Sequence, residues 1–280
     1  IKRQACQMMR KSTLYLFFIF MIFIPLSESY TTNLNDKIVI QSTTSTRDSG
    51  LYDYLIPHFS TKYDINVNIV AVGTGQAIVN ASNCDGDLLI VHSRKLENTF
   101  IANGFGHSRR NIMYNDFIII GPNYDPLDIS SSLDVKSVFH KLSTGQSKFI
   151  SRGDNSGTND SELNKWDLIN YDPRDHSGKW YLESGQSMGA TLNMAISLNA
   201  YTYTDRSTWL RFKNKQNHVI SYNNRNELRN NYSIIKISKD NCPNINHEGA
   251  ALFYDWILSD DGKDLIESYR YNNEQMFFID

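Results

Sequence analysis

The chain has 280 residues, of which 40% are hydrophobic, so it can bury a full core and form one large domain or two lobes. Its 28 basic and 30 acidic residues give a net charge of −2. No polybasic tract occurs, which argues against a nucleic-acid partner. An anionic ligand would therefore have to be held by local geometry and not by global charge.

The N-terminal segment has the layout of a secretory signal peptide. A short basic stretch at 8–11 precedes an apolar run at 14–24, and Ser27 and Ser29 supply small residues for a cleavage site. We therefore expect residues 1–29 to form a cleaved signal peptide, with 1–7 as upstream read-through. The apolar run is shorter than the roughly 20 residues that span a bilayer, which disfavours the alternative of a signal anchor. No cysteine stands at the cleavage site, so we expect an exported protein without a lipid anchor.

Two cysteines, Cys84 and Cys242, remain after the predicted cleavage. In an oxidising compartment they could pair, but the sequence leaves the disulfide open. Neither a CxxC nor an HExxH motif occurs, so no metal site is expected.

The next segments alternate between strand and helix patterns. Residues 36–41 predict a buried strand, 51–62 a helix with apolar residues at helical spacing, and 65–72 a second strand. A helix at 76–80 and a strand at 87–91 follow. This order is typical of a parallel α/β sheet.

The middle of the chain repeats the pattern. A strand at 115–121 leads into a more polar segment at 123–147, which we interpret as the crossing into a second lobe. Beyond it, a strand at 148–150 precedes a loop and a helix at 160–169. A further helix at 190–200 has a glycine-rich entry.

The last elements return to the first lobe. Residues 232–237 predict a strand, and 248–269 a long amphipathic helix that is broken near 261–262. We therefore expect lobe 1 to comprise 30–121 and 233–280, and lobe 2 to comprise 122–232.

Three segments rich in Ser, Thr and Gly follow predicted strands, at the edge where open α/β sheets bind ligands. They are STTSTRDSG at 42–50, GTG at 73–75 and SRGDNSGT at 151–158. Hydroxyls and backbone N–H groups at a helix start stabilise an anion, and Arg152 adds a planar fork of donors that is always charged. We expect the loops to hold one small oxyanion, with donors from Thr43, Thr44, Ser45, Thr46 and Arg152.

Each loop also has a simpler interpretation when it is taken alone. The first would cap a helix, the second would form a plain turn, and the third would form a surface turn with a solvated arginine. No GxSxG elbow and no P-loop occurs, which disfavours a secreted hydrolase. Arg-Gly-Asp at 152–154 leaves open an adhesion protein. An adhesion loop would project outward, whereas an anion loop would face a cleft.

Seven motifs recur together in one protein family: STTSTRDSGL (42–51), VGTGQA (72–77), DLLIVH (87–92), MYNDFIIIGP (113–122), FISRGDNSGTN (149–159), ESGQSMGATLNMA (183–195) and AYTYTDRSTWL (200–210). Through them the chain resembles the tungstate-binding periplasmic components of ABC transporters from about Ile38 to Phe278. The resemblance implies a type 2 periplasmic-binding fold. In that fold two α/β lobes, each a mainly parallel sheet flanked by helices, are joined by two crossing strands.

The resemblance also implies a function. A protein of this kind captures tungstate in the cleft between its lobes and delivers it to an ABC permease, as a periplasmic monomer without a cofactor or catalytic residues. A broader binder of molybdate, phosphate or sulfate is the alternative, and a cytoplasmic regulator with the same sensor fold is disfavoured by the signal peptide.

The expected oxyanion site follows from the motifs and the resemblance together. Asn155 and Asn159 depart from the family pattern, which often has Asp and His there. The choice between tungstate and molybdate stays open, as does the role of Asp154, which could pair with Arg152, cap the helix or help to reject a wrong anion. The expected ligands are Thr43, Thr44, Ser45, Thr74, Arg152, Ser156, Gly157 and Thr158.

Overall fold

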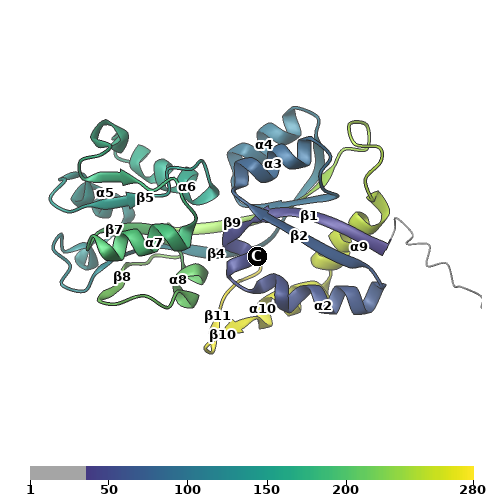
Figure 1. Cartoon of the computed structure of the whole chain (residues 1–280). Coiled ribbons are helices and arrows are strands. Elements are labelled where there is room, and N and C mark those ends of the chain that lie inside the picture. Colours follow the sequence, from purple (N-terminus) through teal and green to yellow (C-terminus); the bar gives the residue numbers. More distant parts are fainter. Residues whose placement is uncertain (1–35) are drawn as a thin grey trace, which may run out of the picture. The chain divides into compact units, whose positions relative to one another are not determined.

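The computed structural model describes residues 36–280 (Figure 1). The predicted signal peptide and the first residues of lobe 1 lie outside this range. Within residues 36–280 we find no helix that combines the length and the hydrophobicity needed to cross a membrane.

The strands are paired in the order β2-β1-β3-β9-β4-β7-β5-β6, and β8 pairs with β4 (Figure 1). In the first lobe β1 is parallel to β2 and β3, and in the second lobe β5 is parallel to β6 and β7. A two-stranded sheet of β10 and β11 stands apart. The bounds are β1 (Lys37–Thr43), β2 (Asn66–Val72), β3 (Leu88–Val91), β4 (Gly106–Pro122), β5 (Phe149–Ser151), β6 (Tyr181–Glu183), β7 (Tyr201–Asp205), β8 (His218–Tyr222), β9 (Arg229–Ile237), β10 (Arg270–Tyr271) and β11 (Glu274–Gln275).

Two antiparallel strands, β4 and β9, carry the chain between the lobes. β4 pairs with β9 as far as Asp116 and with β7 from Phe117 onward. The predicted fold, two α/β lobes joined by two crossing strands, is therefore confirmed. The predicted lobe boundaries at 121 and 232 stay a prediction, and the exchange of partners along β4 falls a few residues before the first of them.

Helices flank both halves of the sheet (Figure 1). Those predicted at 51–62, 76–80, 160–169 and 190–200 are confirmed as α2, α3, α6 and α7. The bounds are α1 (Thr44–Asp48), α2 (Leu51–Tyr63), α3 (Thr74–Ser82), α4 (Arg94–Ala102), η2 (Ile129–Ser131), α5 (Val135–Ser143), α6 (Gly157–Asp167), η3 (Pro173–His176), α7 (Met188–Ser197), α8 (Arg206–Arg211), α9 (His247–Leu258) and α10 (Asp260–Ser268).

Two local predictions were wrong. Segment 123–147 is not the crossing, because it follows β4 into the second lobe and forms α5, whose apolar face includes the buried Val138 and Leu142. Part of the first Ser/Thr loop is the short helix α1. The predicted break in the C-terminal helix is confirmed: it falls at Ser259, whose hydroxyl accepts the Gly262 N–H and caps α10.

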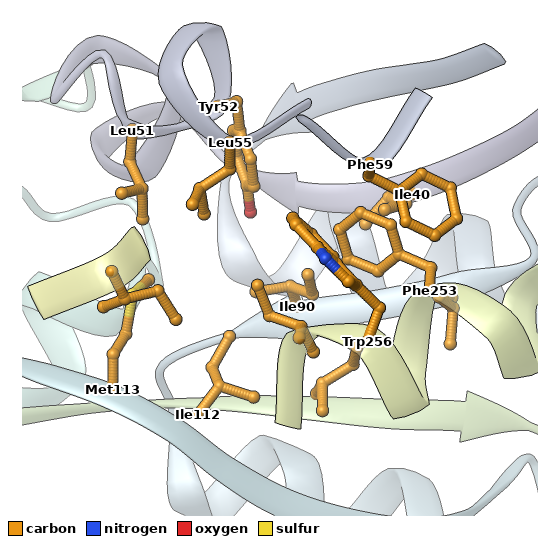
Figure 2. Close-up of a cluster of buried hydrophobic side chains, with 14 of the residues drawn as sticks. Ile40, Leu51, Tyr52, Leu55, Phe59, Ile90, Ile112, Met113, Phe253 and Trp256 are labelled. Atoms are coloured by element: carbon orange, nitrogen blue, oxygen red, sulfur yellow. The ribbon is translucent and has the colours of Figure 1, made fainter. Parts of the chain in front are cut away.

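Each lobe has its own hydrophobic core. In the first lobe, aromatic rings of α2 and α9 pack over the sheet: the Phe59 ring centroid lies 4.9 Å from that of Phe253 and 5.2 Å from that of Trp256 (Figure 2). In the second lobe, Phe139 and Trp166 are packed edge to face. Separate cores make each lobe an independently packed body, so a relative motion would concentrate in β4 and β9.

A disulfide joins Cys84 and Cys242, which are 158 residues apart in the sequence and have Cα atoms 5.4 Å apart. Cys84 follows α3 and Cys242 follows β9, so the bond lies within the first lobe. The structure thus answers the question that the sequence left open.

Candidate oxyanion-binding site

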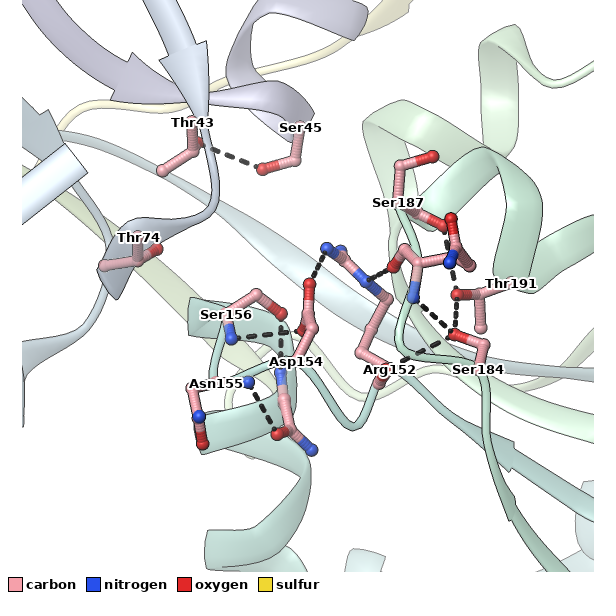
Figure 3. Close-up of polar contacts among 12 residues, drawn as sticks. Thr43, Ser45, Thr74, Arg152, Asp154, Asn155, Ser156, Ser184, Ser187 and Thr191 are labelled. Carbon is pink, nitrogen blue, oxygen red and sulfur yellow. Dashed lines mark hydrogen bonds and ion pairs between the residues drawn. The ribbon is translucent and has the colours of Figure 1, made fainter. Parts of the chain in front are cut away.

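The arginine-bearing loop joins β5 to α6 in the second lobe. Arg152 is only 4% exposed. Its Nη2 donates to Asp154 Oδ2 at 2.5 Å, and its Nε donates to the Gln186 carbonyl oxygen at 2.7 Å (Figure 3). Asp154 Oδ1 in turn accepts the Ser156 N–H at 3.1 Å. Asp154 therefore fixes both the guanidinium and the backbone that leads into α6.

The same loop requires a left-handed turn. Gly153 has φ +58°, and a Cβ placed on it would lie 2.6 Å from the Cβ of Glu183. Only glycine fits such a position without strain. The turn directs Arg152 inward, and this burial argues against the adhesion alternative, which needs an exposed Arg-Gly-Asp loop.

The hydroxyl-rich residues of the first lobe lie at the carboxyl ends of β1 and β2. Thr43 Oγ1 shares hydrogen bonds with Thr46 Oγ1 at 2.8 Å and with Ser45 Oγ at 3.2 Å, and all three side chains are buried. Thr44 is the first residue of α1 and is half-buried. Thr74 is the first residue of α3 and is fully buried.

The structure brings these two sets of residues together. Figure 3 shows Thr43, Ser45 and Thr74 of the first lobe opposite Arg152 and Ser156 of the second lobe. Direct contacts also join the lobes: the Gly157 N–H donates to Thr74 Oγ1 at 3.2 Å, and Ser93 Oγ donates to Asp160 Oδ2 at 2.9 Å.

The start of α6 adds further donors. Ser156 is the N-cap, and its hydroxyl accepts the Asn159 N–H at 3.3 Å. Thr158 is buried, and its Oγ1 has no hydrogen-bond partner among residues 36–280. A buried hydroxyl without a partner is costly and normally marks a place where another group completes the bond.

His92 separates the facing loops from the crossing strands. Its ring stacks on Tyr232 with centroids 4.9 Å apart, and its Nδ1 lies 2.9 Å from Asn230 Oδ1. Burial lowers the pKa of His92, so the ring is neutral at pH 7. Its Nδ1–H then donates to Asn230, which leaves Nε2 to accept from Ser45 Oγ at 3.4 Å. This arrangement gives His92 a structural role.

A buried carboxylate, that of Glu162, connects the elements on either side of the arginine loop. Glu162 on α6 accepts hydrogen bonds from Ser151 Oγ at 2.5 Å and from Trp166 Nε1 and Tyr181 OH at 2.9 Å each. Burial raises the pKa of Glu162 to about 7. The group connects β5, β6 and α6, the three elements that hold the loop in place.

One part of the site was not predicted as such. Residues 184–187 follow β6 and wrap around Arg152: Gly185 N–H donates to the Arg152 carbonyl oxygen at 2.9 Å, and Ser184 Oγ shares a hydrogen bond with Thr191 at 2.7 Å. The signal was present, since this segment is another Ser/Gly loop between a strand and a helix. Its contact with Arg152 spans more than thirty residues of sequence, which a local pattern does not reveal.

Comparison with known families identifies the fold. The family described as a PBP superfamily domain matches residues 28–261. The chain belongs to the PBP superfamily. The matched residues include parts of both lobes and all the segments that carry the facing loops.

Relatives of this PBP superfamily member include named tungstate-binding proteins. The tungstate-binding protein TupA of Peptoclostridium acidaminophilum is 41% identical over 247 residues, which cover 88% of this chain and 85% of the relative. The crystal structure of the tungstate ABC transporter from Geobacter sulfurreducens matches with a TM-score of 0.78 and 39% identity, covering 85% of this chain and all of that one. The tungstate-binding protein TupA from Desulfovibrio alaskensis matches with a TM-score of 0.75 and 34% identity, covering 86% and 98%.

Proposed function

We propose that this protein captures tungstate between its two lobes and delivers it to an ABC importer. One observation carries the proposal: the groups that face one another in Figure 3 can donate hydrogen bonds, while Asp154, the carboxylate of the arginine loop, already accepts from Arg152 and Ser156 within its own loop. Tungstate is a fully deprotonated tetrahedral dianion whose oxygens all accept and never donate. A set of hydroxyls, backbone N–H groups and one arginine complements it.

The proposed ligands are those expected from the sequence, now grouped by lobe. Thr43, Thr44, Ser45 and Thr74 would act from the first lobe, and Arg152, Ser156, Gly157 and Thr158 from the second. Hydrogen bonds to a charged group contribute roughly 1.5–3 kcal/mol each. Eight such bonds would together contribute roughly 12–24 kcal/mol, from which the costs of desolvation and lobe closure are subtracted, compared with the ~12 kcal/mol that corresponds to nanomolar affinity.

Delivery requires that the lobes open and close. The contacts of Gly157 with Thr74 and of Ser93 with Asp160 join the lobes and would form on closure. The change of partners along β4 at Asp116 supplies a place for the hinge. A protein that closes on an intact anion needs no catalytic residue and no cofactor.

We further infer that the mature protein works as a monomer in the periplasm, after removal of residues 1–29. The signal-like N-terminus and the intrachain disulfide support this location.

Calorimetric titration of the chain with tungstate, molybdate, sulfate and phosphate tests the function. We expect tungstate to bind with a dissociation constant in the nanomolar range. The dissociation constants for sulfate and phosphate should be higher by at least about a hundredfold. Equal affinity for sulfate would establish the broader oxyanion binder instead, and a lack of tungstate binding would refute the proposal. The same titration ranks tungstate against molybdate.

A further inference from the structure

A second polar cavity lies where the two lobes meet the crossing strands, on the other side of His92 from the facing loops. Its volume is about 240 Å³, the size of a small metabolite and not of a macromolecular segment. The first lobe contributes Arg94 and Arg109, α6 of the second lobe contributes Asp160 and Lys165, and the crossing strand β9 contributes Arg229. The cavity is thus lined by residues of both lobes and of a crossing strand.

The walls of this cavity carry an excess of positive charge. Four cationic side chains and one carboxylate line it, although the whole chain has a net charge of −2. Asp160 already accepts a hydrogen bond from Ser93. Arg109 is paired with Glu97, with Nε 2.6 Å from Oε2, and Arg229 is paired with Asp280, so the uncompensated positive charge is that of Arg94 and Lys165. A local excess of one sign inside a concave, partly buried wall concentrates ions of the opposite sign.

Two of the cations have no carboxylate within ion-pairing distance in the described part of the chain. Among residues 36–280, neither Arg94 nor Lys165 takes part in an ion pair. Lys165 Nζ donates to the Glu227 carbonyl oxygen at 2.9 Å, a neutral partner. Burial lowers the pKa of Lys165, which means that its surroundings compensate the charge only in part. A bound anion would supply the missing charge.

We propose that this cavity binds a small polyvalent anion, carrying a phosphate group or two carboxylates, and that its occupation favours the closed arrangement of the lobes. Arg94 and Lys165 approach the occupant from opposite lobes, so both contact it only when the lobes are together.

The two anion sites share a wall. His92 and Gly157 line the cavity, and a Cβ on Gly157 would lie 2.8 Å from the His92 ring, so the lobes touch at this point. Gly157 is also the residue whose N–H bonds to Thr74 beside the first site. Two ligands that favour the same closed state must strengthen each other by the same factor. This coupling, though not the second site itself, rests on the proposed capture of tungstate.

Two probes distinguish the sources of the anionic charge: succinate, with two carboxylates, and glycerol 2-phosphate, with one phosphate group. We expect at least one of them to bind with one-to-one stoichiometry to tungstate-saturated protein in calorimetry, and to raise the affinity for tungstate by roughly fivefold or more. Arg94→Gln and Lys165→Gln should each weaken the probe by about tenfold. Arg94→Gln should leave the affinity for tungstate, measured without a probe, unchanged.

The adjacent lysine provides a matched control. Lys95 is exposed on the same helix turn as Arg94 but does not line the cavity, so Lys95→Gln removes the same charge and should leave probe binding unchanged. The site is refuted if neither probe binds, if Lys95→Gln weakens binding as much as Arg94→Gln does, or if the probes displace tungstate. Probe binding that depends on Arg94 in a protein without tungstate affinity would uphold the site and reject the proposed function.

Discussion

Arg152 and Asp154 form a buried ion pair within one tight loop, with Nη2 2.5 Å from Oδ2. A second pair of the same kind, Arg174 with Asp172, has the same spacing of two residues and a distance of 2.7 Å. The side chains of the first pair are 4% and 19% exposed, whereas those of the second are 59% and 44% exposed. The guanidinium of Arg152 is therefore shielded from bulk water, so a hydrogen bond from it to a ligand is screened less than one from the solvated Arg174.

This contrast predicts the result of removing each arginine. Arg152→Ala should weaken tungstate binding by about a hundredfold or more, because it removes charge-assisted bonds from a buried position. Arg174→Ala should leave the affinity unchanged. Calorimetry on both variants measures the effect, and circular dichroism confirms that each is folded.

Arg152→Lys separates charge from geometry in the same experiment. Lysine keeps the positive charge but lacks the fork that donates to Asp154 and to the Gln186 carbonyl oxygen together. We expect an intermediate affinity. Near-native tungstate affinity of the Arg152→Ala variant would show that Arg152 is not a ligand of the anion.

The sequence identified the arginine loop but not all of its contacts. Strands followed by Ser/Thr/Gly segments were recognisable because the apolar pattern and the turn residues change within a few positions. The role of Asp154 could not be recognised in the sequence, since an aspartate two residues after an arginine can pair with that arginine or face a ligand equally well. In the structure Asp154 pairs with Arg152, because the left-handed turn at Gly153 folds the loop back on itself. A part for Asp154 in rejecting a wrong anion stays a prediction.

Elements that depend on long-range contacts were the ones missed. Helix α5 was hidden by the polar residues around it, although its buried face packs into the core of the second lobe. Strand β7 has a mixed sequence and is defined by its position between β4 and β5. Such assignments depend on neighbours distant in the sequence, so local propensity cannot supply them.

Gly157 provides a test of lobe closure. An added Cβ would come within 2.8–3.0 Å of the His92 ring in the opposite lobe, and that buried ring is held by Asn230 and Tyr232. Gly157→Ala should therefore hold the lobes apart and weaken tungstate binding by about tenfold or more, while each lobe remains folded. Gly189→Ala is the matched control, because it also lies in the first turn of a helix and its Cβ would meet no atom within 4 Å.

Calorimetry and small-angle X-ray scattering together check this expectation. Scattering should show that tungstate compacts the native protein and the Gly189→Ala variant but compacts Gly157→Ala less. Native affinity and native compaction in Gly157→Ala would show that the contact with His92 is not formed in the tungstate-bound state.

Glu162 makes a prediction about pH. Its pKa is raised from 4.5 to about 7 by burial, so between these pH values the folded protein keeps a proton that the unfolded chain has released. The stabilising contribution of the protonated group is complete below pH 4.5 and is lost as the pH rises through 7. The shift corresponds to a loss of about 3 kcal/mol in the free energy of unfolding.

Glu162→Gln isolates this contribution, because glutamine resembles the protonated carboxyl group and does not titrate. The stability of the native protein relative to Glu162→Gln should fall as the pH is raised from 4.5 to 7 and stay constant above that range. Denaturant unfolding at a series of pH values measures the difference. Glu267→Gln, the same change at an exposed position of α10, should show no such trend. A difference that rises with pH would mean that the hydrogen bonds from Ser151, Trp166 and Tyr181 stabilise the ionised carboxylate enough to outweigh its burial.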